Sequence, residues 1–574
     1  MKSIFLTIFI VFFAMILISA GKIFYKKSTE PVQFEKQDII SCEPATAAIS
    51  ADESGKFITV LPGWGHHSYR ISTSNDSTQF YFNQGLNFYY SYHFKEALAS
   101  FKEAARFDQS CTMAYWGQAL AMGPYYNNYF YKMSKEVPDV IKRMNDYLPS
   151  ATEKEKALIT AMQQRYSADT TNRDRKQLDS NYAAAMSLLT KQFASDDDVK
   201  ALYIDAVMLA HKWDFWFNDG SPKKWTTELI QTCESILSRN PTHPAALHYL
   251  IHVTEASKHP ELALHSADVL KETLPGVGHM VHMATHMYQR NGLYAKGVYV
   301  NEDANIASNH TDSVAPYLGI GKNSNLHVYA VQSYCAMNAG MFAKGMPVYF
   351  RARNRLLQLR TPSDKDAYSQ YVYMMPVIAW VRLGKWKEIL QSPSPDASWK
   401  YALALDDFAK GLASVRNKDL IKAKQYLSDL QNNMQDSLLS VRLMPFNKPV
   451  QCTKIAEGIL QGEILYAEGK TTEALAAFKQ AVDEEDKLIY CEPKDWLIPS
   501  RQYLGACLLK MNRAVEAEKI FREDLVNNPG NGWSLMGMHK SMLMQKKASE
   551  AAEFKAAFDK AWVAADVRLQ SSVF

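Results

Sequence analysis

The sequence predicts an all-α fold in which paired helices repeat along the chain and stack into a solenoid. Three observations support this prediction. Helical periodicity returns along most of the chain, and no long strand-like alternation of polar and apolar residues interrupts it. Several segments place small and aromatic residues at shared offsets. The chain of 574 residues is too long for one compact core, so a repeat array or several domains is expected.

The N-terminal end predicts export. Ile4 to Ala20 is almost wholly apolar, with Lys2 before it and three lysines shortly after it. A run of this length lies between a signal peptide and a membrane span. We therefore expect residues 1–21 to be a signal peptide or a membrane anchor, and the protein to be periplasmic or anchored facing the periplasm. Residues 22–77 should form a polar tether and a pre-solenoid segment.

The shared offsets are those of a tetratricopeptide (TPR) unit. Residues 78–109 carry Gly85, Ala97, Phe101 and Ala104, at unit positions 8, 20, 24 and 27. The set recurs as Gly462, Ala474, Phe478 and Ala481 in 455–486, as Gly505, Ala517, Phe521 and Pro529 in 498–529, and in part as Gly411 and Ala423 in 404–430. Small residues let paired helices approach and the aromatic fills the gap between them. We therefore expect a TPR-like α-solenoid, a right-handed superhelix of helical hairpins with a concave groove.

Histidines concentrate in the middle of the chain. Eight of the fifteen lie between His243 and His286. Two sets have helical spacing and share a helix face: His248, His252 and Glu255, and then His279, His282 and His286. Pro244 is well placed in the first turn of the first of these helices.

The histidine sets fit the same repeat grid. One unit starts at Pro244, the next at Gly278, and a third near Leu326, which adds His327. These positions are expected to line the concave groove. The predicted organisation is a helical N-terminal region over 78–240, His-rich central units over 241–360 and C-terminal units over 361–574.

Imidazoles that converge from neighbouring helices predict a metal site. Neutral imidazole is a good ligand for zinc, copper, nickel and iron. Glu255 is expected to be a fourth ligand, a partner of a ligating histidine, or a base beside a bound water. The alternative is a set of polar groove residues that hydrogen-bond to backbone or water. No His-Glu-x-x-His occurs, so a zincin peptidase is not indicated.

The other histidines are expected in different surroundings. His66 and His67 lie in a turn-rich segment that could fold over the groove and add a ligand. His211 is expected in an aromatic packing cluster. The remaining three in the stretch fall off the shared face and are expected at the surface or at helix caps: His243, His259 and His265.

Cysteine usage and charge exclude several classes of protein. The seven cysteines form no C-x-x-C motif, so zinc ribbons, thioredoxin chemistry and c-type haem are disfavoured and buried free thiols are expected. The net charge of +4 is small for this length and gives no reason to expect nucleic acid.

The chain also resembles a family of bacterial tetratricopeptide-repeat proteins. The resemblance begins near Leu61 and rests on Phe82-Asn83-Gln84-Gly85-Leu86, Ala114-Tyr115-Trp116-Gly117, His248-Tyr249-Leu250-Ile251-His252, Gly278-His279-Met280-Val281-His282-Met283-Ala284-Thr285-His286, Asn325-Leu326-His327, Glu492-Pro493-Lys494-Asp495-Trp496 and Asn531-Gly532-Trp533. The family commonly has Met-Pro-Ser-His where this chain has Met283-Ala284-Thr285-His286, and it places the histidine near Tyr92-His93-Phe94 differently. The resemblance implies the fold and functional histidines, and it names no reaction.

Two functions from different classes fit these observations. One is an exported scaffold or binding protein whose groove holds a divalent transition metal and a peptide or protein partner. The other is a metal-dependent enzyme in which His248, His252, His282 and His286 hold the ion, with Glu255 or His279 beside an open coordination position. Metal content separates either from a plain polar groove.

Overall fold

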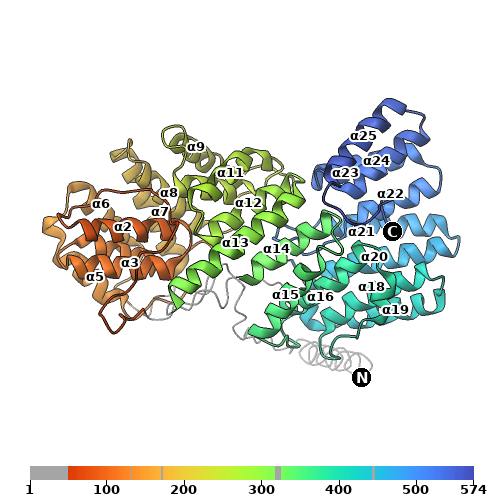
Figure 1. The fold of residues 1–574 in the computed structure, drawn as a ribbon, viewed down its shortest axis with the longest axis horizontal. Helices are drawn as coiled ribbons and strands as arrows, with labels where there is room; N and C mark the ends of the chain where they lie inside the picture. Colours follow the sequence, from red (N-terminus) through yellow and green to blue (C-terminus); the bar gives the residue numbers. More distant parts are fainter. Residues whose placement is uncertain (1–48, 129–130, 170–171, 173, 317–324, 442–446) are drawn as a thin grey trace, which may run out of the picture. The chain divides into compact units, whose positions relative to one another are not determined.

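The computed structural model describes residues 49–574 except 129–130, 170–171, 173, 317–324 and 442–446. Within these residues the fold is all-α, a TPR-like α-solenoid with one isolated β-bridge, between Trp216 and Pro222. Figure 1 follows the chain as successive helical pairs from α2 to α25. The predicted signal or anchor over 1–21 lies outside the described residues, and the described helices include none long and apolar enough to span a membrane.

The first part of the solenoid contains eight helices. Their bounds are α2 Asp76–Tyr90, α3 Phe94–Phe107, α4 Thr112–Ala121, α5 Val137–Asp146, α6 Glu153–Gln164, α7 Arg175–Gln192, α8 Asp197–Ala210 and α9 Thr226–Leu237, with a 3-10 turn at Leu148–Ser150.

The helices that carry the histidines follow. They are α10 Pro244–Thr254, α11 Leu264–Thr273, α12 Gly278–Arg290, α13 Tyr294–Val314, α14 Asn325–Asn338 and α15 Met346–Leu359, with a 3-10 turn at Pro260–Ala263. The C-terminal helices are α16 Ala367–Arg382, α17 Trp386–Gln391, α18 Lys400–Arg416, α19 Leu420–Asn433, α20 Pro449–Ala467, α21 Thr471–Glu485, α22 Ser500–Lys510, α23 Ala514–Asn527, α24 Gly532–Met544 and α25 Ala548–Ala561, with a 3-10 turn at Ser437–Ser440.

The small and aromatic positions of the repeat pack against each other as expected. A Cβ added to Gly85 would lie 2.7 Å from the ring of Phe101, and one added to Gly462 would lie 2.6 Å from the ring of Phe478. Gly505 approaches the ring of Phe521 still more closely. The aromatic of each second helix therefore occupies the space that the glycine of the first helix leaves open.

The turns between paired helices share one backbone conformation. Tyr92 (φ 57°) joins α2 to α3, and Gly292 (φ 72°) joins α12 to α13. The same left-handed conformation recurs at Gly340, Gly384, Lys418, Gly469, Asn512 and Lys546. Because this conformation costs free energy for any residue with a Cβ, the non-glycine turns are maintained by the packing around them.

The buried apolar residues form two clusters that meet in the middle of the chain. One runs from Ile49 to Ala315 and the other from Tyr294 to Val573, so they overlap within α13. Helix α12 contributes to the first cluster and α14 to the second. The histidine helices therefore lie where the two clusters join.

Replacing Phe521 by alanine should destabilise the protein strongly. The ring is fully buried between α22, α23 and α24, so its loss leaves a cavity worth about 3–5 kcal/mol. Chemical denaturation measures the change in the free energy of unfolding. Val526→Ala, on the same helix at a side chain 70% exposed, is the control and should change it by less than about 0.5 kcal/mol. Equal effects of the two substitutions would contradict the packing described here.

Candidate metal centre

Helix α10 presents the first histidine pair to the interior. Pro244 opens the helix and the side chain of His243 caps it, accepting from the backbone N–H of Ala246 at 3.4 Å. His248 and His252 then follow one turn apart on the same face. Glu255 is the residue at which the helix ends, so its carboxylate lies beside His252.

Helix α12 presents the second set, and both of its ends are held by close glycine contacts. Before the helix, Gly276 donates its N–H to the carbonyl of Gly63 at 3.0 Å, and a Cβ on Gly63 would lie 2.6 Å from Gly276 N. After the helix, Gly292 packs directly on Gly530. These contacts position α12 between an N-terminal segment and a C-terminal turn.

All six predicted histidines come together. They form two groups in which the ligand atoms lie within 4.8 Å of one another: His248, His252 and His279, and then His282, His286 and His327. In the first group, Nε2 of His279 lies 3.2 Å from Nε2 of His248. In the second, Nε2 of His286 lies 3.1 Å from Nε2 of His282. Two ligands of one tetrahedral zinc ion are separated by about 3.3 Å when each bond is 2.0–2.1 Å long, so both spacings suit a shared ion.

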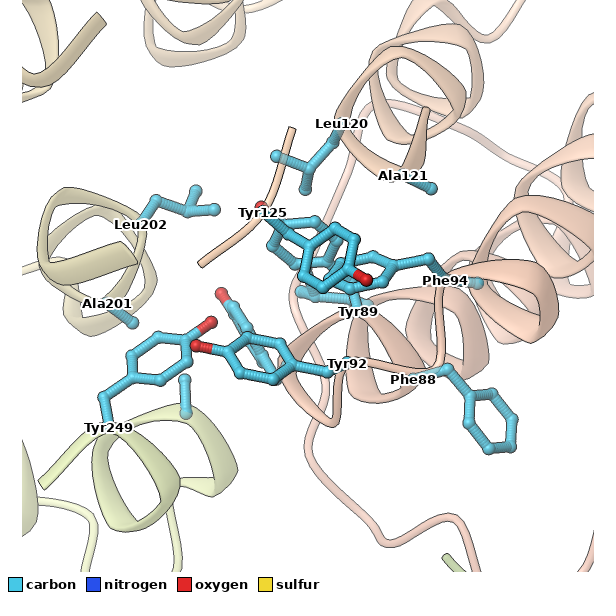
Figure 2. Packing of buried hydrophobic residues seen from close by; sticks show 14 of the residues in the cluster. Phe88, Tyr89, Tyr92, Phe94, Leu120, Ala121, Tyr125, Ala201, Leu202 and Tyr249 are labelled. Carbon is cyan, nitrogen blue, oxygen red and sulfur yellow. The ribbon is translucent and has the colours of Figure 1, made fainter. Parts of the chain in front are cut away.

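The expectation of an open groove is wrong at this point. His248 and His282 are 0% exposed and His279 is 7% exposed, while His327 is partly buried. Other segments cover the rings. Tyr92, in the turn after α2, lies 4.6 Å from His248 between ring centroids, and further cover comes from Tyr126, Trp213 and Glu492. Figure 2 shows Tyr92 and Tyr249 of α10 directed toward one another, and the ring of Tyr249 lies 5.6 Å from that of His248 between centroids.

The Nδ1 atoms of the first group point to oxygen acceptors. His248 Nδ1 lies 2.7 Å from the carbonyl oxygen of Tyr90, and His252 Nδ1 lies 3.1 Å from Glu255 Oε1. A carbonyl or an ionised carboxylate can only accept, so each Nδ1 must donate its proton. The Nε2 atoms of these neutral rings then carry lone pairs. Among the described residues, the buried Nε2 of His252 has no hydrogen-bond partner.

The second group follows the same rule. His282 Nδ1 lies 2.6 Å from Asn301 Oδ1, and Asn301 Nδ2 donates to the carbonyl of Gly297, which establishes which end of the amide faces the ring. His286 Nδ1 lies 2.8 Å from Glu255 Oε2 and also contacts Glu492. With both Nδ1 atoms donating, the facing Nε2 atoms of His282 and His286 need either a proton on one of them or a metal ion between them.

Two carboxylates lie against the histidines. Glu255 is hydrogen-bonded to His252 through one oxygen and to His286 through the other. Glu492 contacts His286 and accepts from Gln289 Nε2 at 3.0 Å and from Tyr490. These contacts suit a partner of ligating histidines, and Glu255 also forms, with His286 and Glu492, a further group whose ligand atoms lie within 4.8 Å of one another.

Sequence reasoning missed three of these partners. Glu492 is far from the histidines in the chain, although it belongs to the Glu492-Pro493-Lys494 motif of the family resemblance. Asn301 and the Tyr90 carbonyl have no recognisable spacing to any histidine. All three become visible only when the helices are placed in space.

Burial and the two carboxylates set the charge of the rings. Burial lowers the pKa of His248, His279 and His282 well below the usual value, and lowers the pKa of His252 and His327 to about 3. Burial would also lower the pKa of His286, but Glu492 and Glu255 outweigh it and raise it to about 10. Burial raises the pKa of both carboxyls.

A third cluster contrasts with these two. His67 Nε2 lies 2.8 Å from Asp198 Oδ1, His243 Nε2 lies 3.6 Å from the same oxygen, and Tyr90 donates its hydroxyl to it at 2.8 Å. Because His243 Nδ1 accepts the capping N–H of Ala246, the ring carries its proton on Nε2, where an ion would have to bind. Asp198 thus accepts hydrogen bonds from His67 and Tyr90, while His243 Nε2 is buried without a hydrogen-bond partner among the described residues.

The histidines outside the central set differ in their surroundings. His67 belongs to the Asp198 cluster, so the expectation that it adds a ligand to the central set is wrong. His66 lines the cavity of about 830 Å³ beside that cluster. His243 is a cap, and His259 and His265 are exposed, as expected. His211 stacks on Trp225 with 3.4 Å between ring centroids, in the aromatic cluster that was predicted, and the ring centroid of His93 lies 6.3 Å from that of His279.

Six cysteines are described, and all are buried free thiols, as predicted.

A cavity of about 920 Å³ lies next to the histidine centre. Trp213 lines it and is 6.4 Å from His252 between ring centroids. Arg290 also lines it and donates to the Glu255 carbonyl at 3.0 Å. Burial lowers the pKa of Lys494, another lining residue, to about 8. One layer of side chains thus lies between this cavity and the histidines.

Comparisons with known proteins identify similar folds and no family for this chain. No protein-family model matches the chain. No curated protein matches it either. The chain is similar to solved structures that include a human IFIT1 dimer with m7Gppp-AAAA (12% identity, TM-score 0.30, 86% of this chain and 91% of that one) and yeast Tom70 (10%, 0.27, 86% and 91%). A third is the APC/C hetero-tetramer Cut9-Hcn1 (10%, 0.26, 86% and 95%). Likenesses at this level say nothing about ligand or activity.

The ring tautomers are directly measurable. In metal-free protein with ¹⁵N-labelled histidine, NMR should find His248, His252 and His282 neutral with the proton on Nδ1, because each Nδ1 faces an acceptor. His243 is the internal control and should carry its proton on Nε2. Protons on Nε2 of the three central rings would contradict the geometry.

Proposed function

We propose that the protein binds a divalent transition metal in the closed cluster of His248, His252, His279, His282, His286 and His327. The observation that carries the proposal is the orientation of four of these rings, which donate from Nδ1 to oxygen acceptors and turn Nε2 inward. Metal-ligating histidines are held in this way. An all-imidazole donor set suits zinc, copper, iron or nickel.

The cost of the cluster without an ion supports the same conclusion. A buried polar group without a partner costs about 1–3 kcal/mol, and His252 Nε2 is such a group among the described residues. An ion bound by the Nε2 atoms would offset this cost and would bridge the Nε2 atoms of His282 and His286, which lie 3.1 Å apart. The competing explanation is a proton held on His286 Nε2 and shared with His282.

The wider role we propose is an exported scaffold or binding protein of a bacterial tetratricopeptide-repeat family. The metal would join the two core clusters where α12 and α14 meet. A peptide or protein partner is part of the proposal, and it would contact surfaces other than the buried histidines. We also propose that the protein is exported, and that it is attached to a membrane if residues 1–21 are retained.

Elemental analysis of protein purified without added metal tests the site. We expect a stoichiometric transition metal in the wild type and its loss in the double variant His252→Ala and His282→Ala. The matched control is His259→Ala with His265→Ala, which removes two exposed histidines of the same stretch and should keep the metal. A metal-free wild type that takes up no zinc or copper when loaded would leave the shared proton as the explanation.

Removing the ion should also lower stability. A ligand at a hundred times its dissociation constant stabilises the folded state by about 2.7 kcal/mol. We therefore expect a chelator to lower the melting temperature of the wild type and to leave that of the His252→Ala, His282→Ala variant unchanged. An equal effect on both proteins would show that the chelator acts elsewhere.

A metal-dependent enzyme is the second candidate, and the adjacent cavity favours it. Trp213 and Arg290 line this cavity and contact His252 and Glu255, respectively, so a substrate could lie close to the ion. An enzyme needs a coordination position that the protein leaves open. In cobalt-substituted protein, azide should then shift the visible spectrum. A spectrum insensitive to azide indicates a closed, structural site.

A further inference from the structure

Six histidines are too many for one tetrahedral ion, and the distances between their rings separate them into two groups of three. Within the first group, the ring of His248 lies 4.8 Å from that of His252 and 5.1 Å from that of His279. Within the second, the ring of His282 lies 4.9 Å from that of His286 and 5.0 Å from that of His327. Each group therefore has the three nitrogen ligands of an ion that keeps a further position for a non-protein ligand.

The two groups adjoin each other along two edges. His252 and His286 lie 6.1 Å apart between ring centroids, and His279 and His282 lie 6.3 Å apart. These separations are little larger than the 5.8 Å between His286 and His327 of one group. Two ions placed in the groups would therefore be neighbours.

A single carboxylate orients one ligand of each group. Glu255 accepts from His252 of the first group at 3.1 Å and from His286 of the second at 2.8 Å. The other two oriented ligands have separate acceptors, the Tyr90 carbonyl for His248 and Asn301 for His282. Each group thus has one hydrogen-bond acceptor of its own, and both groups share the acceptor Glu255.

We propose that the centre holds two transition-metal ions side by side, one on each group of three imidazoles, joined by a small oxygen ligand such as hydroxide. This inference rests on the proposed metal-binding function. It requires the remaining position of each ion to face the other group, since the rings occupy the outer sides. Ions bound in pairs at such sites lie about 3.5–4 Å apart.

Copper loading of the full chain tests the proposal. We expect two Cu²⁺ ions per chain by elemental analysis and almost no electron paramagnetic resonance (EPR) signal, because two Cu²⁺ ions that share an oxygen couple magnetically. One ion per chain with a full EPR signal would overturn the two-ion centre and leave the proposed metal binding intact. Two ions with full signals would overturn their adjacency. No bound copper would overturn both proposals.

Half-site variants provide the matched comparison. His248→Ala removes a ligand of the first group only, and His327→Ala removes one of the second group only. Each should reduce the content from two ions to one and restore the EPR signal of a single Cu²⁺. If either alanine variant fails to fold, His248→Gln and His327→Gln keep side-chain volume and a polar end for the same measurement. Retention of two coupled ions in both variants would contradict the assignment.

The shared support gives a further readout. Glu255→Gln should weaken both ions by about 10–100-fold, because the loss of a partner that orients a ligand typically costs that much. Asn301→Leu should weaken the second ion alone, since Asn301 accepts from His282 of the second group. Competition with a chelator of known affinity measures the affinity for each ion in both variants. An effect of Glu255→Gln on one ion alone would contradict its role as the common support.

Discussion

The hydrogen bonds that Glu255 accepts from His252 and His286 are the interaction on which the rest of the centre depends. Glu255 is fully buried at the end of α10, so its carboxylate needs donors, and the Nδ1 atoms of these rings supply them. Each donation directs Nε2 of the ring away from the carboxylate. The same logic at the Tyr90 carbonyl and Asn301 extends this orientation to His248 and His282.

The fold places these rings through packing at some distance from them. Helix α12 is held between Gly63 before it and Gly530 after it, by backbone approaches that a side chain at Gly276 or Gly292 would prevent. The Tyr92 turn and Glu492 then close the space over the rings. The solenoid thus contains a closed polar interior at the join between its two core clusters.

The repeat pattern predicted the fold well because it is a local rule of packing. Glycine and phenylalanine at offsets 8 and 24 determine how two consecutive helices meet, as Gly85 with Phe101 and Gly462 with Phe478 show. Helical spacing likewise predicted which histidines share a face. The closure of the groove was not predictable, because Tyr92 and Glu492 reach the histidines from remote segments. His67 was assigned wrongly for the same reason, since its partner Asp198 lies 131 residues away on α8.

Anomalous diffraction from a crystal grown with copper or zinc tests the central claim most directly. We expect anomalous density among the inward-facing nitrogens, at about 2.0–2.1 Å from the Nε2 atoms if zinc is bound. The Nδ1 atoms of His248, His252, His282 and His286 should keep their oxygen partners. Absence of such density, with the ion on exposed histidines or with His286 and His282 still in direct contact, would contradict it.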